Sequence, residues 1–350
     1  MGVATASRAL AGRPTVNAEM RRRVLAAAEE LGYQPDILAQ GLRRGVSRSV
    51  GLIADDLSNH LFADIATGAE GALRAEGYSL LVMNSEMDPR LDVANVRVLL
   101  ARRADALMMA PVLEDDPELV RELEGLGIPF VDVEGDLPAA VPASYVHSDH
   151  RAGVVAALGD LIERGHRRLC VITGPSVFRS ARQRRLAVED VNAASGPEVR
   201  VAAIEAELTT DDGRRAAAGV LDLRDPPSAI IVGGWQLLTG VLASVRERGL
   251  RLGHDLSLVA SDPPPLAAVF EPPLAAITRD ADGLGAHAAG LLLERLRQPG
   301  LEPRQVMLPT EYRPAGSVDE PPSVRSRAGS PDGRRRPRRA TRPSGTRPRR

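Results

Sequence analysis

From residue 49 onward, two patterns of apolar residues alternate along the chain, one typical of strands and one typical of helices. Short apolar runs recur, and stretches with apolar residues at helical spacing separate most of them. The predicted strands lie at 49–56, 78–85, 104–111, 129–135, 168–175, 199–204, 228–234, 256–262 and 274–280. Apolar strands that alternate with amphipathic helices indicate parallel sheets covered on both faces. Because so many strands do not suit one small sheet, we expect an α/β fold of two βαβ lobes.

Polar or small residues follow several of these predicted strands. The residues at the carboxyl ends are Asp55-Asp56, Asn84-Ser85, Pro111, Gly174-Pro175, Gly233-Gly234 and Asp262. In open parallel sheets, ligands bind in the crevice beyond the carboxyl ends of the strands. We therefore expect a ligand cleft at these positions, between the two lobes.

The first 48 residues are helical and basic instead. In VNAEMRRRVLAAAEELGY, Asn17 is the expected N-cap, Glu19 lies in the first turn and Gly32 follows the end. One apolar stripe at helical spacing comprises Met20, Val24, Ala27, Ala28 and Leu31. After the break at Pro35, DILAQGLRRG predicts one further short helix.

Charge is distributed unevenly, although the formal net charge is only −1. The chain contains no lysine, and residues 1–50 carry +4, residues 321–350 carry +10 and the part between them carries −15. Basic ends on an acidic body suggest that the ends meet a polyanion. The alternative for the last residues is a solvated, disordered extension, because Pro, Gly, Ser and Arg dominate after Pro314 and build no core.

Several classes of protein are disfavoured by the sequence. Cys170 is the only cysteine, so neither a disulfide framework nor a cysteine metal site forms within one chain. No run approaches the 18 or so apolar residues of a membrane span. Arg8 interrupts the short apolar stretch near the start, which argues against a signal peptide. We expect a cytoplasmic protein with no membrane partner.

Motifs of enzymes and metal sites are weak or missing. GLGAHA (283–288) satisfies a dinucleotide fingerprint, but too few strands follow it, and small residues on a packed helix explain it better. The cluster His147-Ser148-Asp149-His150 lacks a second group of ligands elsewhere. No G-x-S-x-G elbow occurs, and without lysine no phosphate-binding GK[ST] loop exists. We therefore expect neither an enzyme nor a cofactor nor a metal.

Several stretches resemble the LacI/GalR family of transcriptional regulators. The family's segment between its DNA-binding and effector domains is similar to VNAEMRRRVLAAAEELGYQPDILAQGLRRGVSRSVGLIADDLSNHLFADI. Further similar stretches, in the family's order, are LIERGHRRLCVITGP, RERGLRLGHDLSLVASD and EPPLAAITRDADGLG. The resemblance covers about residues 4–313. It implies a repressor that reads near-palindromic operator DNA as a homodimer and is switched allosterically by a small, carbohydrate-like molecule.

The resemblance also implies the domain boundaries. It places a partial helix-turn-helix headpiece at 1–34, a hinge helix and linker at 35–48, an N-lobe at 49–148 plus 277–303, a C-lobe at 149–276 plus 304–316, and a disordered tail at 317–350. The two lobes form a core like that of periplasmic binding proteins.

DNA-binding residues follow from the same resemblance. Thr5, Ser7 and Arg8 match the family's recognition helix, which enters the major groove, where arginine donates to guanine. Tyr33 resembles a position near a backbone phosphate, with packing as the alternative. Ala39 and Leu42 match hinge-helix positions that meet in the minor groove, where an inserted leucine kinks the duplex.

Six further positions align with the family's effector cleft: Phe62, Asp149, Arg179, Arg185, Trp235 and Asp262. The carboxylates accept ligand hydroxyls, the arginines donate a fork of hydrogen bonds, and the aromatic faces stack on a ring. Core packing is the alternative for the two aromatic residues, and helix capping is the alternative for the two aspartates.

The chain also departs from the family pattern. Gly234-Trp235 replaces an Asn-Asp pair, Pro263 follows Asp262 in place of a polar residue, and His60 replaces a proline. These changes leave open a non-sugar ligand or a degenerate pocket.

The opening ATASRALAG (4–12) resembles the latter part of a recognition helix. The family has another helix before it, which buries Ala6, Ala9 and Leu10. We expect 5–10 to be too short to be helical alone, so the gene start is placed too late or this copy has a damaged headpiece. Two other functions stay open: a solute-binding protein, and a sensor of the same core fold that has lost DNA binding.

Overall fold

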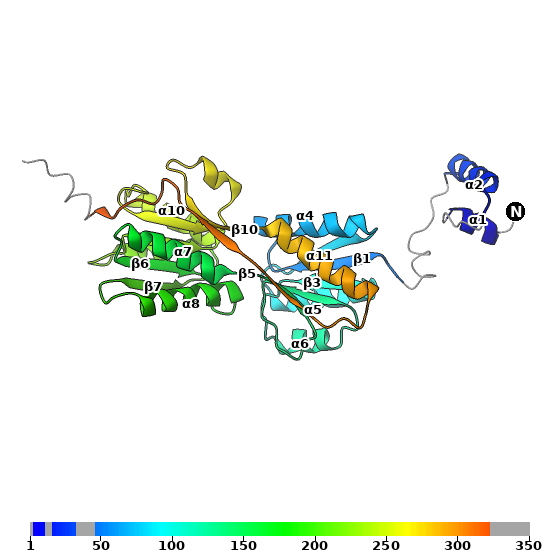
Figure 1. The fold of residues 1–350 in the computed structure, drawn as a ribbon, viewed down its shortest axis with the longest axis horizontal. Helices are drawn as coiled ribbons and strands as arrows, with labels where there is room; N and C mark the ends of the chain where they lie inside the picture. The colour runs from blue at the N-terminus through cyan, green and yellow to red at the C-terminus, as the bar shows by residue number, and fades with distance from the viewer. Residues whose placement is uncertain (1–2, 11–15, 33–45, 323–350) are drawn as a thin grey trace, which may run out of the picture. The chain divides into compact units, whose positions relative to one another are not determined.

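The computed structural model describes residues 3–10, 16–32 and 46–322. They form a pair of short helices followed by two α/β units, each built on its own six-stranded sheet (Figure 1). Unit 1 comprises Met1–Val154, Thr173–Ala187 and Ile277–Tyr312, and unit 2 comprises Val155–Ile172, Val188–Ala276 and Arg313–Arg350. This confirms the predicted fold class of two lobes behind a partial helical headpiece.

The headpiece consists of α1 (Val3–Leu10) and α2 (Ala18–Glu30), joined by a small apolar contact. Ala9 of α1 and Val24 of α2 are buried together with Val16. The side chain of Asn17 accepts a hydrogen bond from the Met20 N–H at 2.8 Å, which confirms the predicted N-cap. The segment 5–10, which is too short to be helical alone, is stabilised as part of α1 by packing on α2. The predicted apolar stripe is only partly correct, since Leu31 is 81% exposed.

Unit 1 contains a fully parallel sheet in the order β11-β5-β4-β3-β1-β2. Its strands are β1 (Ser49–Ala54), β2 (Ser79–Asn84), β3 (Ala106–Met109), β4 (Phe130–Val133), β5 (Ser144–Ser148) and β11 (Gln305–Leu308). Its helices are α4 (His60–Ala75), α5 (Pro89–Ala101), α6 (Pro117–Glu124) and α11 (Ala281–Arg297). Each core strand alternates its apolar side chains between two helical layers.

Leu52 and Ile53 show this alternation on β1. Leu52 packs in the core formed with α4 and α11, and Ile53 packs in the core formed with α5 and α6. Helices α4 and α11 cross closely, because a Cβ atom on Gly285 would lie 1.9 Å from the carbonyl oxygen of Ile65. This confirms that small residues on a packed helix explain GLGAHA.

Unit 2 has a sheet in the order β12-β10-β9-β8-β6-β7. Its strands are β6 (Arg168–Thr173), β7 (Arg200–Glu205), β8 (Ala229–Gly233), β9 (Ser257–Ser261), β10 (Ala275–Arg279) and β12 (Thr310–Arg313). Its helices are α7 (His150–Glu163), α8 (Arg179–Ala194), α9 (Thr210–Leu221), α10 (Trp235–Glu247) and the 3₁₀ helix η1 (Pro265–Val269). Parts of these elements group with unit 1 instead: residues 150–154 of α7, 179–187 of α8, 277–279 of β10 and 310–312 of β12. Helix α9 crosses α10 closely, since a Cβ on Gly240 would lie 2.0 Å from the Thr210 carbonyl oxygen.

The unit boundaries differ from the predicted lobes at three places. Strand β11 pairs with β5 in unit 1, whereas 304–316 was expected in the C-lobe. The first turn of α7 stays with unit 1, where a Cβ on Gly153 would lie 2.3 Å from Thr310 Oγ1. Residues 173–187 also group with unit 1. Strand pairing and close helix packing, which sequence patterns do not display, decide these boundaries.

The predicted tail boundary at 317 also differs from the structure. Ser317 is fully buried, donates a hydrogen bond to the Leu258 carbonyl at 2.6 Å and accepts one from the Ala275 N–H at 2.8 Å. Val318 is buried beside it, and His166 Nε2 lies 2.9 Å from the Asp319 carbonyl oxygen. Residues 317–322 therefore belong to unit 2. Within the described residues, no helix is long and apolar enough to cross a membrane.

Candidate functional site

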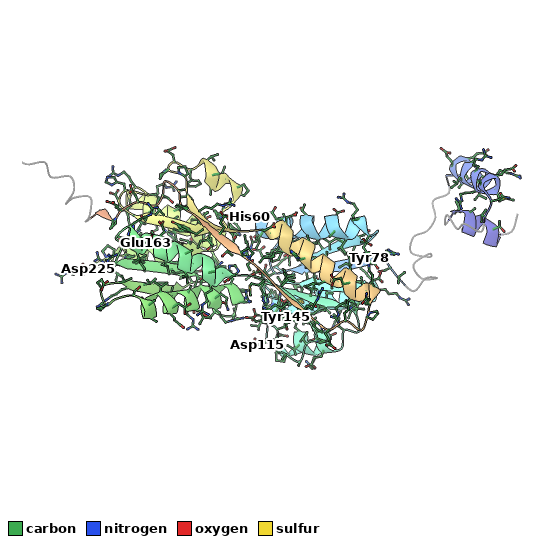
Figure 2. All side chains as sticks on the ribbon, in the orientation of Figure 1. His60, Tyr78, Asp115, Tyr145, Glu163 and Asp225 are labelled. Carbon is green, nitrogen blue, oxygen red and sulfur yellow. The ribbon has the colours of Figure 1, made fainter. Side chains whose placement is uncertain are left out.

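The carboxyl ends of the unit 1 strands carry a concentration of charged side chains. Strand β1 is followed by Asp55, β4 by Glu134, and β5 by Asp149 and His150. His60, the first residue of α4, follows the β1 end in the chain and is labelled in Figure 2. Because neighbouring parallel strands end at one edge, side chains from distant parts of the sequence meet there.

Glu134, His150 and Arg279 form the first buried cluster at this edge. Oε2 of Glu134 lies 2.8 Å from His150 Nε2 and 3.2 Å from Arg279 Nη1. Burial alone raises the pKa of Glu134, but the positive charge of Arg279 and the contact with His150 outweigh it and hold that pKa far below its usual range. Burial lowers the pKa of His150, so the neutral ring donates its Nε2–H to the carboxylate.

Asp132 holds the turn that carries Glu134. Its side chain is fully buried and accepts hydrogen bonds from the Gly135 N–H at 3.0 Å and the Leu137 N–H at 3.2 Å. Glu134 itself has φ +68°, a left-handed backbone conformation that few non-glycine residues adopt. Burial raises the pKa of Asp132 to about 8. The hydrogen bonds of the buried Asp132 side chain therefore stabilise this turn.

Arg179 and Arg182, on the first turns of α8, form a second cluster with Glu114 and Asp136. Arg179 Nε lies 3.2 Å from Asp136 Oδ1, and its Nη1 donates to the Ser148 carbonyl at 3.1 Å. Arg182 Nη2 lies 2.6 Å from Glu114 Oε2 and 2.9 Å from Asp136 Oδ2. Burial raises the pKa of Glu114, and the contact with Arg182 opposes that rise. The two guanidinium groups are thus held in fixed orientations.

Two further carboxyl groups at this edge have weakened acidity. Burial raises the pKa of Asp55 to about 7 and that of Asp92, on α5, to about 6. Asp92 Oδ2 accepts a hydrogen bond from the Val112 N–H at 2.8 Å. Oδ1 of Asp55 is buried and has no hydrogen-bond partner among the residues of the structure. A carboxyl group in this state offers both a donor and an acceptor to a ligand.

The structure brings only some of the predicted effector residues into these clusters. Arg179 is at the centre of one. Asp149 lies at the same edge, where its Oδ1 accepts a hydrogen bond from the Ala152 N–H at 3.0 Å, so it caps α7. Phe62 is 4% exposed and packs in the core between α4 and the sheet, as the core-packing alternative describes.

Arg185, the second arginine predicted on α8, does not face the core. Arg185 is exposed, whereas its neighbour Arg184 is buried, with Nη1 3.5 Å from Thr173 Oγ1. Consecutive helical residues point about 100° apart, so only one of the pair faces the sheet. Of these two neighbouring arginines, Arg184 is therefore the buried one.

Trp235 and Asp262 follow strands of unit 2. Trp235 is the first residue of α10, is half-buried, and its Nε1–H is buried without a hydrogen-bond partner among the described residues. Asp262 follows β9 and has φ +45°. Unusual backbone conformations of this kind cluster at functional sites.

The predicted DNA-binding residues are only partly described. Thr5 is half-buried in α1. Ser7 and Arg8 belong to the same helix, and their side chains lie outside the described set. Tyr33, Ala39 and Leu42 lie outside the described residues altogether.

Sequence reasoning missed the cluster partners Glu114, Glu134, Arg182, Arg184 and Arg279 as site residues. Glu134 and Arg279 each stand at or just after the carboxyl end of a predicted strand, so the rule that selected Asp55 applies to them also. His150 was considered only as a metal ligand. In the described part of the chain, no three His, Cys, Asp or Glu side chains are grouped in a way that holds a metal ion.

Two family models match this chain, one at its helical headpiece and one in its α/β units. The family of bacterial regulatory proteins called lacI matches residues 1–36, and the periplasmic binding protein-like domain matches residues 158–318. The transcriptional repressor PurR of Klebsiella pneumoniae (strain 342) is 31% identical over 283 residues, which cover 79% of this chain and 82% of the relative.

Two solved structures share the fold. A complex of the transcriptional regulator CelR with cellobiose is 26% identical, with a TM-score of 0.69, and the match covers 91% of this chain and 96% of that one. A lac repressor dimer bound to operator and an anti-inducer is 24% identical, with a TM-score of 0.79 and coverage of 90% and 95%. The chain therefore belongs to the lacI family of bacterial regulatory proteins.

Proposed function

We propose that this protein is a DNA-binding transcriptional repressor whose operator affinity is switched by a small molecule. The observation that carries the proposal is the combination of a lacI-type headpiece, matched over residues 1–36, with two α/β units in one chain. The PurR relative is named a repressor. The protein acts in the cytoplasm and catalyses no reaction.

The effector is a carbohydrate-like metabolite that binds at the carboxyl edge of the unit 1 sheet. Sugar hydroxyls both donate and accept hydrogen bonds, and this edge supplies fixed guanidinium donors on Arg179 and Arg182 beside carboxyl groups such as Asp55. The structure of CelR contains cellobiose, a sugar of this chemistry. Asp149, Phe62 and Arg185 are further proposed effector contacts. In the structure Asp149 caps α7, Phe62 packs in the core and Arg185 is exposed.

In unit 2, Trp235 and Asp262 are the proposed effector contacts. An aromatic ring whose buried Nε1–H lacks a partner suits an acceptor atom on a ring-shaped ligand. Because Trp235 stands where the family pattern has a polar residue, we expect the preferred sugar to differ from those of relatives with the Asn-Asp pair.

The repressor acts as a homodimer, and an apolar groove of unit 2 supports this. The groove has a volume of about 790 Å³ and is lined by α10, η1 and the segments at 250–252 and 270–274. Leu266 and Phe270 on its rim are 69% and 38% exposed. Exposed apolar side chains gathered along one groove suit contact with a second subunit, and two-fold dimers present paired headpieces to a near-palindrome.

Fluorescence anisotropy tests the DNA-binding function. The full chain is titrated with labelled fragments from upstream of its own and neighbouring genes, across a salt series. We expect one sequence to bind preferentially, with affinity that falls steeply as salt rises. Binding with no sequence preference at low salt contradicts the proposal and favours a sensor that has lost DNA binding.

Sedimentation velocity tests the dimer. Phe270→Glu places a charge in the groove and is expected to yield monomers, whereas Leu223→Glu, an exposed residue of the same unit outside the groove, leaves the dimer intact. If both variants sediment as the unaltered protein does, the groove is not the subunit interface.

A further inference from the structure

A small pocket lies at the amino edge of the unit 1 sheet, where the chain enters β4, β5 and β11. It has a volume of about 180 Å³, and the side chains that shape it include Leu126, Ile128, Pro129, Pro142, Pro299 and Arg295. All of them belong to unit 1. The candidate effector site stands at the other end of the same strands, so this pocket is a separate feature.

Arg295, in the last turn of α11, is the only charged side chain that lines the pocket. Its Nε is buried and has no hydrogen-bond partner in the described part of the chain. Its Nη1 makes one long contact, 3.4 Å, with the Pro142 carbonyl oxygen. The guanidinium group therefore uses little of its donor capacity.

The charged neighbours of Arg295 on α11 are already paired elsewhere. Arg297 Nη2 lies 2.6 Å from Glu76 Oε2, and Glu294 pairs with Arg304. Among residues 46–322, Arg295 itself has no acidic partner. A cation that is partly removed from water without an anion is unfavourable, and an incoming anion relieves that cost.

We propose that this pocket binds a small monocarboxylate with an apolar body about the size of one ring. A cavity of about 150 Å³ lined by apolar side chains holds benzene, so the volume suits such a body. Proline and isoleucine side chains provide the walls, and the planar guanidinium group of Arg295 matches a carboxylate. The site is a second ligand site, distinct in chemistry from the effector site.

The chemistry of the walls excludes other ligand classes. The proline, leucine and isoleucine side chains of the walls offer no hydrogen-bond donors or acceptors to the hydroxyl groups of a sugar. A second negative charge on the ligand meets apolar walls and the carbonyl oxygen of Pro142 rather than another cation. One carboxylate on an apolar body is the combination that satisfies both parts of the pocket.

Isothermal titration calorimetry of the full chain tests this, with benzoate as the probe and benzamide as its neutral counterpart of the same shape. Benzoate is expected to bind saturably with one site per chain. Benzamide is expected to bind at least about tenfold more weakly, because its neutral amide does not form the charge-assisted hydrogen bonds of a carboxylate with Arg295. Arg295→Leu is expected to weaken benzoate by about tenfold or more. Arg297→Leu, on the same helix but outside the pocket, is the matched control and leaves benzoate binding unchanged.

A second variant keeps the test decisive if Arg295→Leu does not fold. Ile128→Trp fills the pocket and leaves Arg295 in place, so it is expected to abolish benzoate binding while thermal unfolding still shows a folded core. The proposal is overturned by any of three results: no saturable benzoate binding, equal binding of benzamide, or benzoate binding that survives Ile128→Trp.

Discussion

The carboxylate of Asp105 accepts the backbone N–H of Arg48 at 2.8 Å, across 57 residues of sequence. It also accepts the Ser47 N–H at 2.9 Å. Arg48 has φ +56°. Its guanidinium carbon lies over the ring of Tyr78, 5.0 Å from the ring centroid, and its Nη1 donates a hydrogen bond to the Glu76 carbonyl oxygen. One carboxylate thus fixes the segment through which the chain enters β1.

The first prediction concerns this attachment. Asp105→Ala removes the acceptor of two backbone donors, so we expect the free energy of unfolding to fall by about 1–3 kcal/mol. Amide protons in 46–50 are expected to lose protection in hydrogen exchange measured by mass spectrometry. Asp115→Ala, at an exposed loop position, serves as the control. Unchanged protection in 46–50 would show that Asp105 does not hold this segment.

The second prediction concerns the ion pair of Glu134 and Arg279. Glu134→Gln removes the negative charge that faces the buried guanidinium group of Arg279, and we expect the free energy of unfolding in urea at pH 7 to fall by about 3 kcal/mol. Because the pKa of Glu134 is lowered on folding, its contribution is present above the ordinary value of 4.5 and is lost as pH falls further. The difference between the variant and the unaltered protein should therefore narrow only in acid.

Glu163→Gln, at the exposed end of α7, is the control for that measurement. It should differ little from the unaltered protein at every pH. A Glu134→Gln variant as stable as this control at pH 7 would contradict a stabilising ion pair.

The third prediction uses the raised pKa of Asp55. Burial raises this pKa from 3.8 to about 7, so the folded state binds a proton more tightly than the unfolded state does. The associated stability is fully present below pH 3.8 and is lost as pH rises through 7. Asp55→Asn mimics the protonated form, and we expect its stability advantage to grow between pH 5 and pH 8, by about 1 kcal/mol or more.

Denaturation with urea at each pH measures this advantage. Asp64→Asn, on the exposed side of α4, provides the comparison and should show no such trend. A constant difference between Asp55→Asn and the unaltered protein across this range is the result that rules the prediction out.

The fourth prediction compares two glycines of α11. Gly285→Ala places a Cβ 1.9 Å from the Ile65 carbonyl oxygen, which the packed helices accommodate only by moving apart, and we expect a loss of about 3 kcal/mol. A Cβ on Gly290 meets no atom within 4 Å, so Gly290→Ala is expected to stabilise by about 0.5–1 kcal/mol through helix propensity. Thermal unfolding of both variants distinguishes packing from propensity, and equal effects would contradict the close crossing.

The family resemblance selected residues at the carboxyl edge of the unit 1 sheet but not the charged side chains that pair with them. Arg179 was predicted and is found in the cluster with Asp136. Arg185 was predicted on the same helix, yet Arg184 is the buried residue. A shift of one residue turns a helical side chain by about 100°, and only the packing of α8 decides which of the two faces inward.

The sequence by itself determined the two α/β units. Nine predicted strands match observed strands with ends that differ by one or two residues, because apolar runs flanked by turn residues are a local signal. Strands β5, β11 and β12 escaped that signal: they are short, and polar side chains such as His147 and Gln305 interrupt them. Their strand conformation depends on neighbours distant in sequence.

Only the tertiary structure decided which charged groups meet. Glu134, His150 and Arg279 come from three segments, and their pairing depends on strand order, which the sequence of apolar runs does not encode. The same holds for Arg295: among the described residues no carboxylate pairs with it, whereas its neighbours Arg297 and Glu294 pair with Glu76 and Arg304. Local patterns specify elements because hydrogen bonding and periodic burial act over a few residues, whereas electrostatic partners are chosen by the packing of the whole unit.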